Sequence, residues 1–272
     1  MRLALIGDPV AHSASPALQR EYLEEAGIQG SYVAIRVARG CGAGASADLR
    51  RERYAGCNVT YPLKEEAAAA CDVLTGEARS AEAVNTIFFG ERTIGTNTDG
   101  IGARSALEAL LDEPIALKRI GVLGYGATAR AILCELHDND AFAFVWGRNQ
   151  ELVAQACRRY EARPWPRSNT PEIVISTLPP DAEIPDDVVA QLRRADVVMD
   201  ANYGVRAVLG ARLKRDVVAG DAMLQAQARA SFDFWLAHLE RERVAQAALE
   251  RKLGLPAGGR VLAWKKQLAC LT

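Results

Sequence analysis

The segment Arg119-Ile120-Gly121-Val122-Leu123-Gly124-Tyr125-Gly126-Ala127-Thr128-Ala129 decides the fold of this chain. Its first half is an apolar run typical of a buried strand. Its second half is a G-x-G-x-x-A turn that leads into an apolar, alanine-rich segment ending near His137. A glycine turn between a strand and a helix lets the backbone approach a pyrophosphate, and the helix N-terminus offers amide donors and a positive dipole end. The segment therefore predicts a dinucleotide site formed by Gly124, Tyr125, Gly126, Ala127 and Thr128.

Strands and helices alternate after this turn. The pattern predicts strands at residues 143–146, 173–176 and 196–199, and helices at 150–160 and 186–193. Strands that alternate with helices in this way pair in parallel through right-handed crossovers. Residues 101–237 are therefore expected to form a Rossmann-type, doubly wound dinucleotide domain.

The first hundred residues carry a second set of strand and helix patterns. We predict strands at 3–6, 31–37, 57–60, 84–89 and 92–95, helices at 47–54 and 65–73, and a helix capped by Ser15 ahead of Pro16. Two more helices, at 221–239 and 243–253, are expected to pack back across this unit. The predicted fold class is α/β. An N-terminal substrate domain with a mainly parallel sheet, residues 1–100 completed by C-terminal helices at about 238–272, faces the dinucleotide domain across a cleft.

Composition limits the classes of function. The chain has 272 residues, of which 49% are hydrophobic and 25% charged, with a formal net charge of -1, so we expect a soluble protein without a basic field for nucleic acid. The six cysteines form no C-x-x-C pair and no cluster with histidine, which favours buried thiols in a reducing compartment and no metal. No apolar run reaches the roughly 18 residues of a membrane span. We therefore expect a cytoplasmic monomer or homodimer that binds a small molecule and no membrane.

The residues after the second strand of the dinucleotide unit bear on the choice of nucleotide. An NAD enzyme usually carries an acidic residue about 20 positions beyond the glycine turn, where it holds the ribose 2′-hydroxyl. This chain has Trp146-Gly147-Arg148-Asn149 there. An arginine suits a 2′-phosphate through its charge and paired donors, although Arg148 is also compatible with a solvated residue ahead of a helix. The sequence predicts NADP, with Gly147, Arg148 and Asn149 among the cofactor contacts.

Lys64 and Asp99 each lie in a tight polar motif ahead of the glycine turn. Lys64 ends Asn58-Val59-Thr60-Tyr61-Pro62-Leu63-Lys64, and Asp99 lies in Asn97-Thr98-Asp99-Gly100. An amine and a carboxylate beside a nicotinamide ring can take a proton from an alcohol while hydride leaves the same carbon. The pair therefore indicates an alcohol dehydrogenase. Small polar side chains near other strand ends suit a compact, oxygenated substrate, although each also has an ordinary cap, strand or turn role: Ser13, Ser15, Asn58, Thr60 and Asn85.

With these motifs the chain resembles the shikimate dehydrogenase family. The matching pieces are His12-Ser13-Ala14-Ser15-Pro16, Asn58-Val59-Thr60 with Pro62 and Lys64, Ala83-Val84-Asn85-Thr86, Asn97-Thr98-Asp99-Gly100, the Gly124 turn, and Met223-Leu224 with Gln227, Phe232 and Trp235. The resemblance implies reduction of 3-dehydroshikimate to shikimate with NADPH in aromatic amino-acid biosynthesis. It also implies roles for side chains: Ser13, Ser15, Thr60 and Tyr203 at the substrate carboxylate, Asn85, Asp99 and Gln227 at ring hydroxyls, and Lys64 with Asp99 as the proton-transferring pair. Thr177, Ala201 and Ala222 fall at family cofactor positions.

The chain departs from the family mostly on the cofactor side. The family's Asn-Arg-Thr is Gly147-Arg148-Asn149, its Asn-Ala-Thr is Ile175-Ser176-Thr177, and Tyr203 is followed by Gly204-Val205 rather than Asn-Pro. Ala222 replaces a glycine. These changes predict weakened NADP selectivity. Two alternatives stay open: a quinate or quinate/shikimate dehydrogenase that uses NAD, and a noncatalytic relative that binds the ligands as a sensor.

Overall fold

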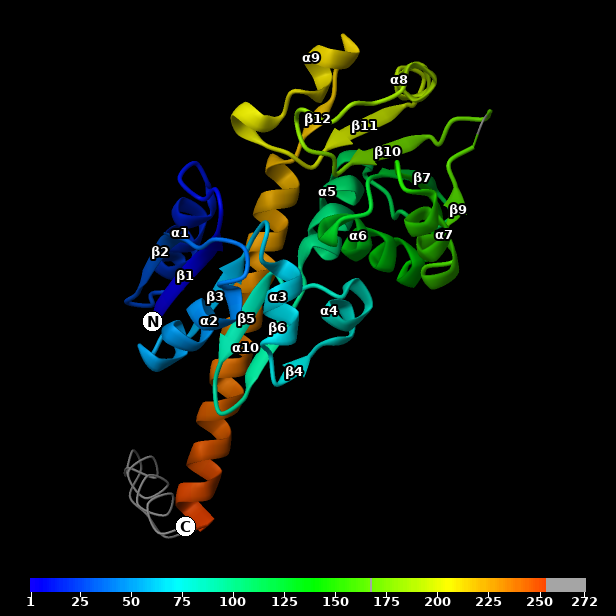
Figure 1. Cartoon of the computed structure of the whole chain (residues 1–272). Helices are drawn as coiled ribbons and strands as arrows, with labels where there is room; N and C mark the ends of the chain where they lie inside the picture. The colour runs from blue at the N-terminus through cyan, green and yellow to red at the C-terminus, as the bar shows by residue number, and fades with distance from the viewer. Residues whose placement is uncertain (167, 253–272) are drawn as a thin grey trace.

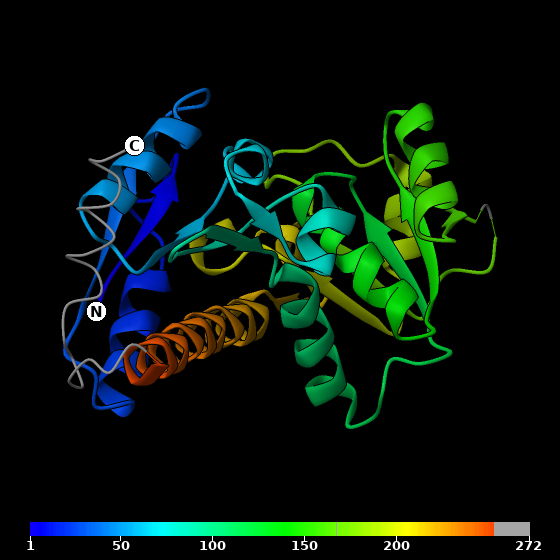
Figure 2. The same cartoon turned by 90° about the horizontal axis from the view of Figure 1, so that it is seen from below.

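The computed structural model describes residues 1–166 and 168–252. Within those residues the strands form two six-stranded sheets, one from each half of the chain (Figures 1 and 2). None of the helices in this described part combines the length and the apolar character needed to cross a bilayer. The predicted α/β class, with two mainly parallel sheets, is confirmed.

The first sheet has the strand order β2-β1-β3-β5-β6-β4. Its strands are β1 (Arg2–Gly7), β2 (Ser31–Arg36), β3 (Gly56–Val59), β4 (Val73–Leu74), β5 (Thr86–Phe89) and β6 (Thr93–Thr96). β1 pairs in parallel with β2 and β3, whereas β5 is antiparallel to both β3 and β6. β3 and β6 therefore run in the same direction, and their carboxyl ends lie at one edge of the sheet. Its helices are α1 (Ser15–Glu25), α2 (Gly42–Arg51), α3 (Lys64–Ala69) and α4 (Gly76–Ala81).

Two predictions about helix starts in this sheet are wrong. Ser15 lies inside α1, whose N-cap is Ala14, and it is the Ser13 hydroxyl that accepts the Ser15 amide at 3.3 Å. The helix expected at 47–54 lies at Gly42–Arg51. Its first turn is satisfied from outside, because the Glu66 carboxylate accepts the amides of Gly40 and Gly42 at 2.8 and 3.0 Å. A cap supplied by a distant helix leaves no local sequence signal.

The second sheet has the order β12-β11-β10-β7-β8-β9, and all of its strand pairs are parallel. Its strands are β7 (Arg119–Leu123), β8 (Phe142–Trp146), β9 (Arg163–Pro164), β10 (Ile173–Ser176), β11 (Val197–Asp200) and β12 (Val218–Ala219). Its helices are α6 (Ala127–Asp138), α7 (Gln150–Arg159), α8 (Asp186–Leu192) and α9 (Leu209–Leu213), with a 3-10 turn η1 at Gly204–Arg206. α6 and α7 bury their apolar residues with Ile120 and Val122, whereas α8 and α9 pack with Leu123 and Val174. Helices on both faces make this the doubly wound unit that the sequence predicted.

Two long helices connect the halves. α5 (Asp99–Leu111) leaves the first sheet, and α10 (Asp221–Lys252) packs along α5 and reaches α1 and β5 (Figure 1). The prediction of two helices at 221–239 and 243–253 is wrong. Glu240-Arg241-Glu242 contains no glycine or proline and consists of strong helix formers, so the helix continues through it. The part of the prediction that falls on 253–272 lies outside the described residues.

Trp235 fixes α10 to the first sheet. Its ring is fully buried with Phe232 and Phe88, and its Nε1 donates to the Ile87 carbonyl at 2.8 Å. Gly56 on β3 lies directly beneath, where a Cβ atom would overlap both the Ile87 carbonyl and the Trp235 indole nitrogen. This contact brings α10, and with it Gln227, to the edge of the sheet where β3 and β6 end.

Candidate active site

Lys64 and Asp99 meet at the edge where the two sheets approach each other. Lys64 begins α3 just after β3, and Asp99 begins α5 just after β6. The Lys64 ammonium donates to Asp99 Oδ2 and forms an ion pair with it. The side chains are only 14% and 7% exposed, so the pair is largely withdrawn from solvent. The structure thus brings together the two residues that the sequence selected as the catalytic pair.

Hydrogen bonds keep the Asp99 carboxylate ionised. Asn85 Nδ2 donates to Oδ1 at 2.7 Å, and the Thr128 hydroxyl donates to Oδ2 at 2.9 Å. Burial would by itself raise the pKa of Asp99, but the Lys64 charge and the bonds from Lys64, Asn85 and Thr128 outweigh it and hold the pKa below its ordinary value.

A buried polar network lies behind the pair. Asn58 Nδ2 donates to the Asn85 carbonyl at 3.2 Å, to Thr86 Oγ1 at 3.0 Å and to Ser231 Oγ at 3.1 Å. The Tyr32 hydroxyl donates to Asn58 Oδ1 at 2.8 Å. Because these partners occupy its amide group, Asn58 supports Asn85 from within the protein.

Gln227 joins this network from α10. The side-chain Oε1 of Gln227 lies 3.5 Å from Asn85 Nδ2. The backbone carbonyl of Gln227 accepts a hydrogen bond from the Thr98 hydroxyl at 3.0 Å. The sequence reasoning missed Thr98 and Ser231. Ser231 follows Gln227 at i,i+4 on one helix face, a spacing that marks it as a neighbour once α10 is recognised.

The residues expected at a substrate carboxylate lie at the ends of β1 and β3. Ser13 and Ser15 follow β1 and contact each other, and the Thr60 amide donates to the Ile6 carbonyl at 2.9 Å. Tyr203 comes from the other half of the chain. It follows β11, just ahead of the η1 turn.

The glycine turn has the geometry of a phosphate cradle. Gly124 has a φ of +104°, and a Cβ there would lie 2.6 Å from Thr177 Oγ1, while nothing lies within 4 Å of a Cβ at Gly126. The Thr177 hydroxyl donates to the Leu123 carbonyl at 2.8 Å, which holds the ends of β7 and β10 together. Ala127 and Thr128 then begin α6. The open space at Gly126, ahead of a helix N-terminus, fits a pyrophosphate.

Ala201 and Ala222, two more predicted cofactor residues, lie near each other, whereas the side chain of Tyr125 is directed elsewhere. Ala201 follows β11, and its carbonyl lies close to Gly220. Gly220 precedes α10, whose first turn contains Ala222. Tyr125 points away from the cradle into the helical layer, where its ring packs on the core and the Arg130 guanidinium lies 5.9 Å from the ring centroid. Its side chain is therefore held by packing, which leaves only its backbone for a nucleotide.

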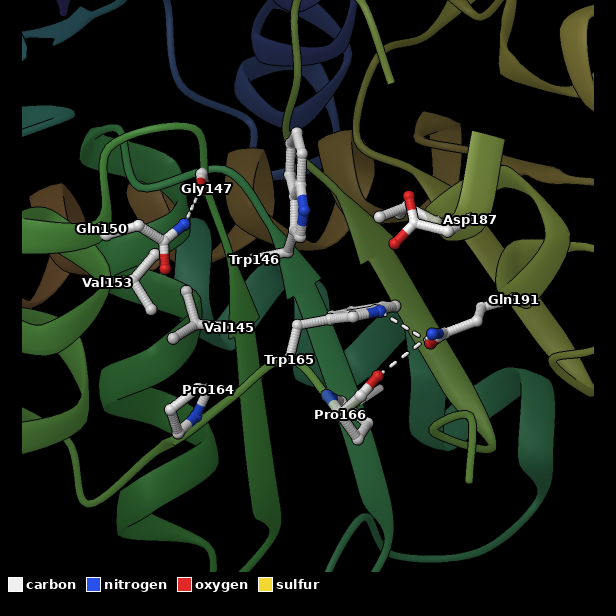
Figure 3. Close-up of a pocket in the computed structure, with 11 residues that line it drawn as sticks. Val145, Trp146, Gly147, Gln150, Val153, Pro164, Trp165, Pro166, Asp187 and Gln191 are labelled. Atoms are coloured by element: carbon white, nitrogen blue, oxygen red, sulfur yellow. Dashed lines mark hydrogen bonds between the residues drawn. The ribbon is translucent and has the colours of Figure 1, made fainter. Parts of the chain in front are cut away.

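A pocket of about 170 Å³ lies beyond the carboxyl end of β8 (Figure 3). Figure 3 shows the Trp146 and Trp165 rings between Gln150 on one side and Asp187 and Gln191 on the other. Gly147 forms part of its wall. The next residue, Arg148, is exposed to solvent. The side chain of Asn149 instead caps α7, where it accepts the Glu151 amide at 2.9 Å. Two indole rings and an adjacent exposed guanidinium fit the adenosine end of a 2′-phosphorylated dinucleotide.

The cysteines and the acidic residues add no further centre in the part of the chain that the structure covers. Among residues 1–166 and 168–252, no group of histidine, cysteine and acidic side chains is arranged to hold a metal ion. Cys57 and Cys134 are buried free thiols. Cys41 is exposed, contrary to the prediction, because it lies at the N-cap position of α2 in a surface loop.

The fold and the site together define a two-domain dehydrogenase that uses a nicotinamide dinucleotide. Residues 5–87 match the model of the shikimate dehydrogenase substrate binding domain. The shikimate dehydrogenase (NADP(+)) of Thermus thermophilus is 32% identical over 266 residues, which cover 94% of this chain and 100% of that protein. The chain belongs to the shikimate dehydrogenase family.

Other relatives agree with this assignment. The shikimate dehydrogenase (NADP(+)) of Acidiphilium cryptum is 42% identical over 161 residues, a match that spans 58% of each protein. The crystal structure of Thermus thermophilus shikimate 5-dehydrogenase in complex with NADP(H) and shikimate has a TM-score of 0.75 at 29% identity, over 86% of this chain and 93% of that one. The crystal structure of an Ael1 enzyme from Pseudomonas putida shares the fold, with a TM-score of 0.77 at 25% identity over 86% of this chain and 92% of that one. The predicted family, the oxidoreductase class and the NADP assignment are confirmed.

Proposed function

We propose that this chain interconverts shikimate and 3-dehydroshikimate with NADP, as a step of aromatic amino-acid biosynthesis. The observation that carries the proposal is the buried Lys64 and Asp99 pair beside the first turn of α6, where the pyrophosphate cradle lies. Residues 1–100, completed by the C-terminal segment from about residue 238, form the substrate domain in this proposal, and residues 101–237 form the NADP domain. A cytoplasmic location and a monomeric or homodimeric state stay predictions.

The pair performs the proton transfer. Bound NADPH supplies the hydride in the reducing direction. As hydride reaches the ketone carbon, negative charge builds on the carbonyl oxygen, and the Lys64 ammonium stabilises that charge and gives the oxygen one proton. Asp99 stays ionised and keeps the ammonium aimed. In the oxidising direction the neutral Lys64 amine takes the proton from the hydroxyl group.

Polar side chains around the pair orient the substrate. Asn85 lies beside Asp99 and Gln227 lies beside Asn85, and both side chains suit ring hydroxyl groups. The hydroxyl groups of Ser13, Ser15, Thr60 and Tyr203 would bind the acid group of the substrate, because the first turn of α1 favours a carboxylate. The arrangement fits a small ring that carries hydroxyl groups on one side and an acid on the other.

The second sheet holds the cofactor. Gly124, Gly126, Ala127 and Thr128 would hold the pyrophosphate, and Arg148 would pair with the 2′-phosphate. Trp146 and Trp165 line the pocket for the flat base (Figure 3). Because Asn149 is committed to capping α7, Arg148 carries most of the discrimination against NAD.

A four-way steady-state assay tests the proposal. Shikimate and quinate are each offered with NADP+ and with NAD+, and formation of reduced nicotinamide is followed by absorbance. The proposal expects the highest kcat/KM with shikimate and NADP+. Highest activity with quinate and NAD+ would support the alternative enzyme, against which Arg148 and the absence of an acidic side chain at Gly147 argue. Ligand binding by calorimetry without turnover of any pair would instead indicate a noncatalytic relative.

A further inference from the structure

The Thr128 hydroxyl bridges the two members of the catalytic pair from the opposite half of the molecule. It accepts a hydrogen bond from Lys64 Nζ at 3.2 Å and donates one to Asp99 Oδ2 at 2.9 Å. Thr128 is the second residue of α6, whereas Lys64 and Asp99 begin helices that follow strands of the first sheet. One hydroxyl group therefore links the glycine turn directly to the proton donor.

We propose that Thr128 is a positioning residue that fixes the direction in which Lys64 delivers its proton, an inference that rests on the function proposed above. An ammonium group has three N–H donors. In this structure one points to Asp99 and one to Thr128. Two fixed donors leave the third aimed in a single direction, toward the substrate oxygen.

The hydroxyl is suited to this task because both of its hydrogen-bonding capacities are used. Its proton goes to Asp99, so its lone pair faces Lys64. The α6 N-cap is Gly126, with no side-chain cap, so Thr128 is not needed to start its own helix. Among residues 1–166 and 168–252, the Thr128 hydroxyl makes its hydrogen bonds with Lys64 and Asp99 alone.

Further contacts connect α6, which follows the glycine turn, to the part of the chain that carries Lys64. α6 is anchored to the first half of the chain by Arg130, which donates to the Ala81 carbonyl at 2.7 Å and to Glu65 Oε1 at 2.6 Å. Glu65 is the neighbour of Lys64 on α3. These contacts hold the glycine turn in a fixed position relative to the Lys64 ammonium. Reaction rates depend steeply on such alignment.

Substitutions separate this role from simple packing. Thr128→Val keeps the shape and removes the hydroxyl, while Thr128→Ser keeps the hydroxyl and removes the methyl group. Thr93→Val is a matched control, because it makes the same change at a buried threonine on β6 whose hydroxyl accepts a hydrogen bond from Arg50 at 3.0 Å and lies away from the catalytic pair.

We expect Thr128→Val to lower kcat by about 10- to 100-fold, with the KM for shikimate within about threefold of the wild type. The solvent isotope effect on kcat should rise, because a misaligned proton transfer limits the rate. Thr128→Ser should stay within about threefold of the wild-type kcat, and Thr93→Val within about twofold. A wild-type kcat and isotope effect in Thr128→Val, or equal losses in the valine and serine variants, would overturn the inference.

A second measurement does not depend on turnover and so separates this inference from the proposed function. The Lys64 Nζ resonance is recorded by NMR of protein labelled with 15N-lysine and assigned through Lys64→Met. We expect a protected ammonium signal in the wild type and in Thr128→Ser, and its loss in Thr128→Val. An unchanged signal in Thr128→Val would contradict the inference even if the wild type turns over none of the tested alcohols, a result that would by itself reject only the proposed function.

Discussion

Asn85 Nδ2 donates to Asp99 Oδ1 at 2.7 Å, on the carboxylate oxygen that Lys64 does not use. Lys64 and Thr128 share the other oxygen. Each oxygen of Asp99 thus has its own donors before any substrate is present, so the carboxylate cannot turn away from the amine. A catalytic group that is already oriented avoids the reorganisation that would otherwise raise the barrier.

Asp99→Asn is expected to destabilise the protein in a manner that depends on pH. The folded pKa of Asp99 lies below that of an unfolded chain, so the ionised pair contributes its full stability above about pH 3.9, the ordinary value, and loses it as pH falls through the lower folded value. Removing one partner of a buried pair costs about 3 to 5 kcal/mol. Urea unfolding should therefore show a large deficit for the variant at pH 7 that narrows in acid.

A deficit that stays constant from pH 7 to acid would contradict the assigned charge state of Asp99. Asp48→Asn is the matched control. Asp48 pairs with Arg51 on the surface of α2, where both side chains are more than half exposed. Exposed pairs contribute about 0 to 1 kcal/mol, so this variant should unfold nearly like the wild type at each pH.

Arg148→Ala is expected to weaken NADP binding selectively. A hydrogen bond to a charged group contributes about 1.5 to 3 kcal/mol, which corresponds to roughly a 10- to 100-fold rise in the KM for NADP+. The KM for NAD+ should hardly change, since that nucleotide lacks the 2′-phosphate. Arg158→Ala removes an exposed arginine from the last turn of α7 and should leave both constants unaltered. Equal effects of Arg148→Ala on the two nucleotides would show that Arg148 does not contact the 2′-phosphate.

Glycine-to-alanine changes at two positions should have opposite effects on stability. At Gly56 a Cβ overlaps the Ile87 carbonyl and the Trp235 ring, so Gly56→Ala should lower the free energy of unfolding by about 1 to 3 kcal/mol. Gly44 lies within α2 with nothing near its Cβ position, and Gly44→Ala should raise it by about 0.5 to 1 kcal/mol. Denaturant titration of both variants measures the difference. An unchanged or raised free energy of unfolding in Gly56→Ala would mean that α10 does not press on β3 as described.

The features that the sequence predicted well are those with strong local signals. The strand before Gly124 and the strand at Ile173–Ser176 are short apolar runs, which is the signature of a parallel strand covered on both faces. The proposed catalytic pair was also accessible from sequence, because polar residues that follow strands running in the same direction in one sheet lie at the same edge of that sheet. Lys64 and Asp99 follow β3 and β6, whose carboxyl ends share that edge.

Features that depend on distant contacts were not accessible. The start of α2 is set by Glu66, and the length of α10 was obscured by its charged centre, which is compatible with either a helix or a linker. Thr128 belonged to a recognisable glycine turn, so its sequence context suggested only a nucleotide contact. Its bonds to Lys64 and Asp99 exist because α6 approaches the first sheet, a packing relation that no local pattern encodes.

The kinetic comparison of the wild type with Lys64→Ala tests the proposed chemistry most directly. Lys118→Ala, which removes an amine paired with Glu113 at 2.6 Å, is the control, and melting temperatures establish that all three proteins are folded. In the assay of shikimate with NADP+, Lys64→Ala should lose about 10²- to 10⁴-fold in kcat with a KM for shikimate within about threefold, while Lys118→Ala behaves like the wild type. A folded Lys64→Ala protein with the wild-type kcat would show that Lys64 does not move the proton.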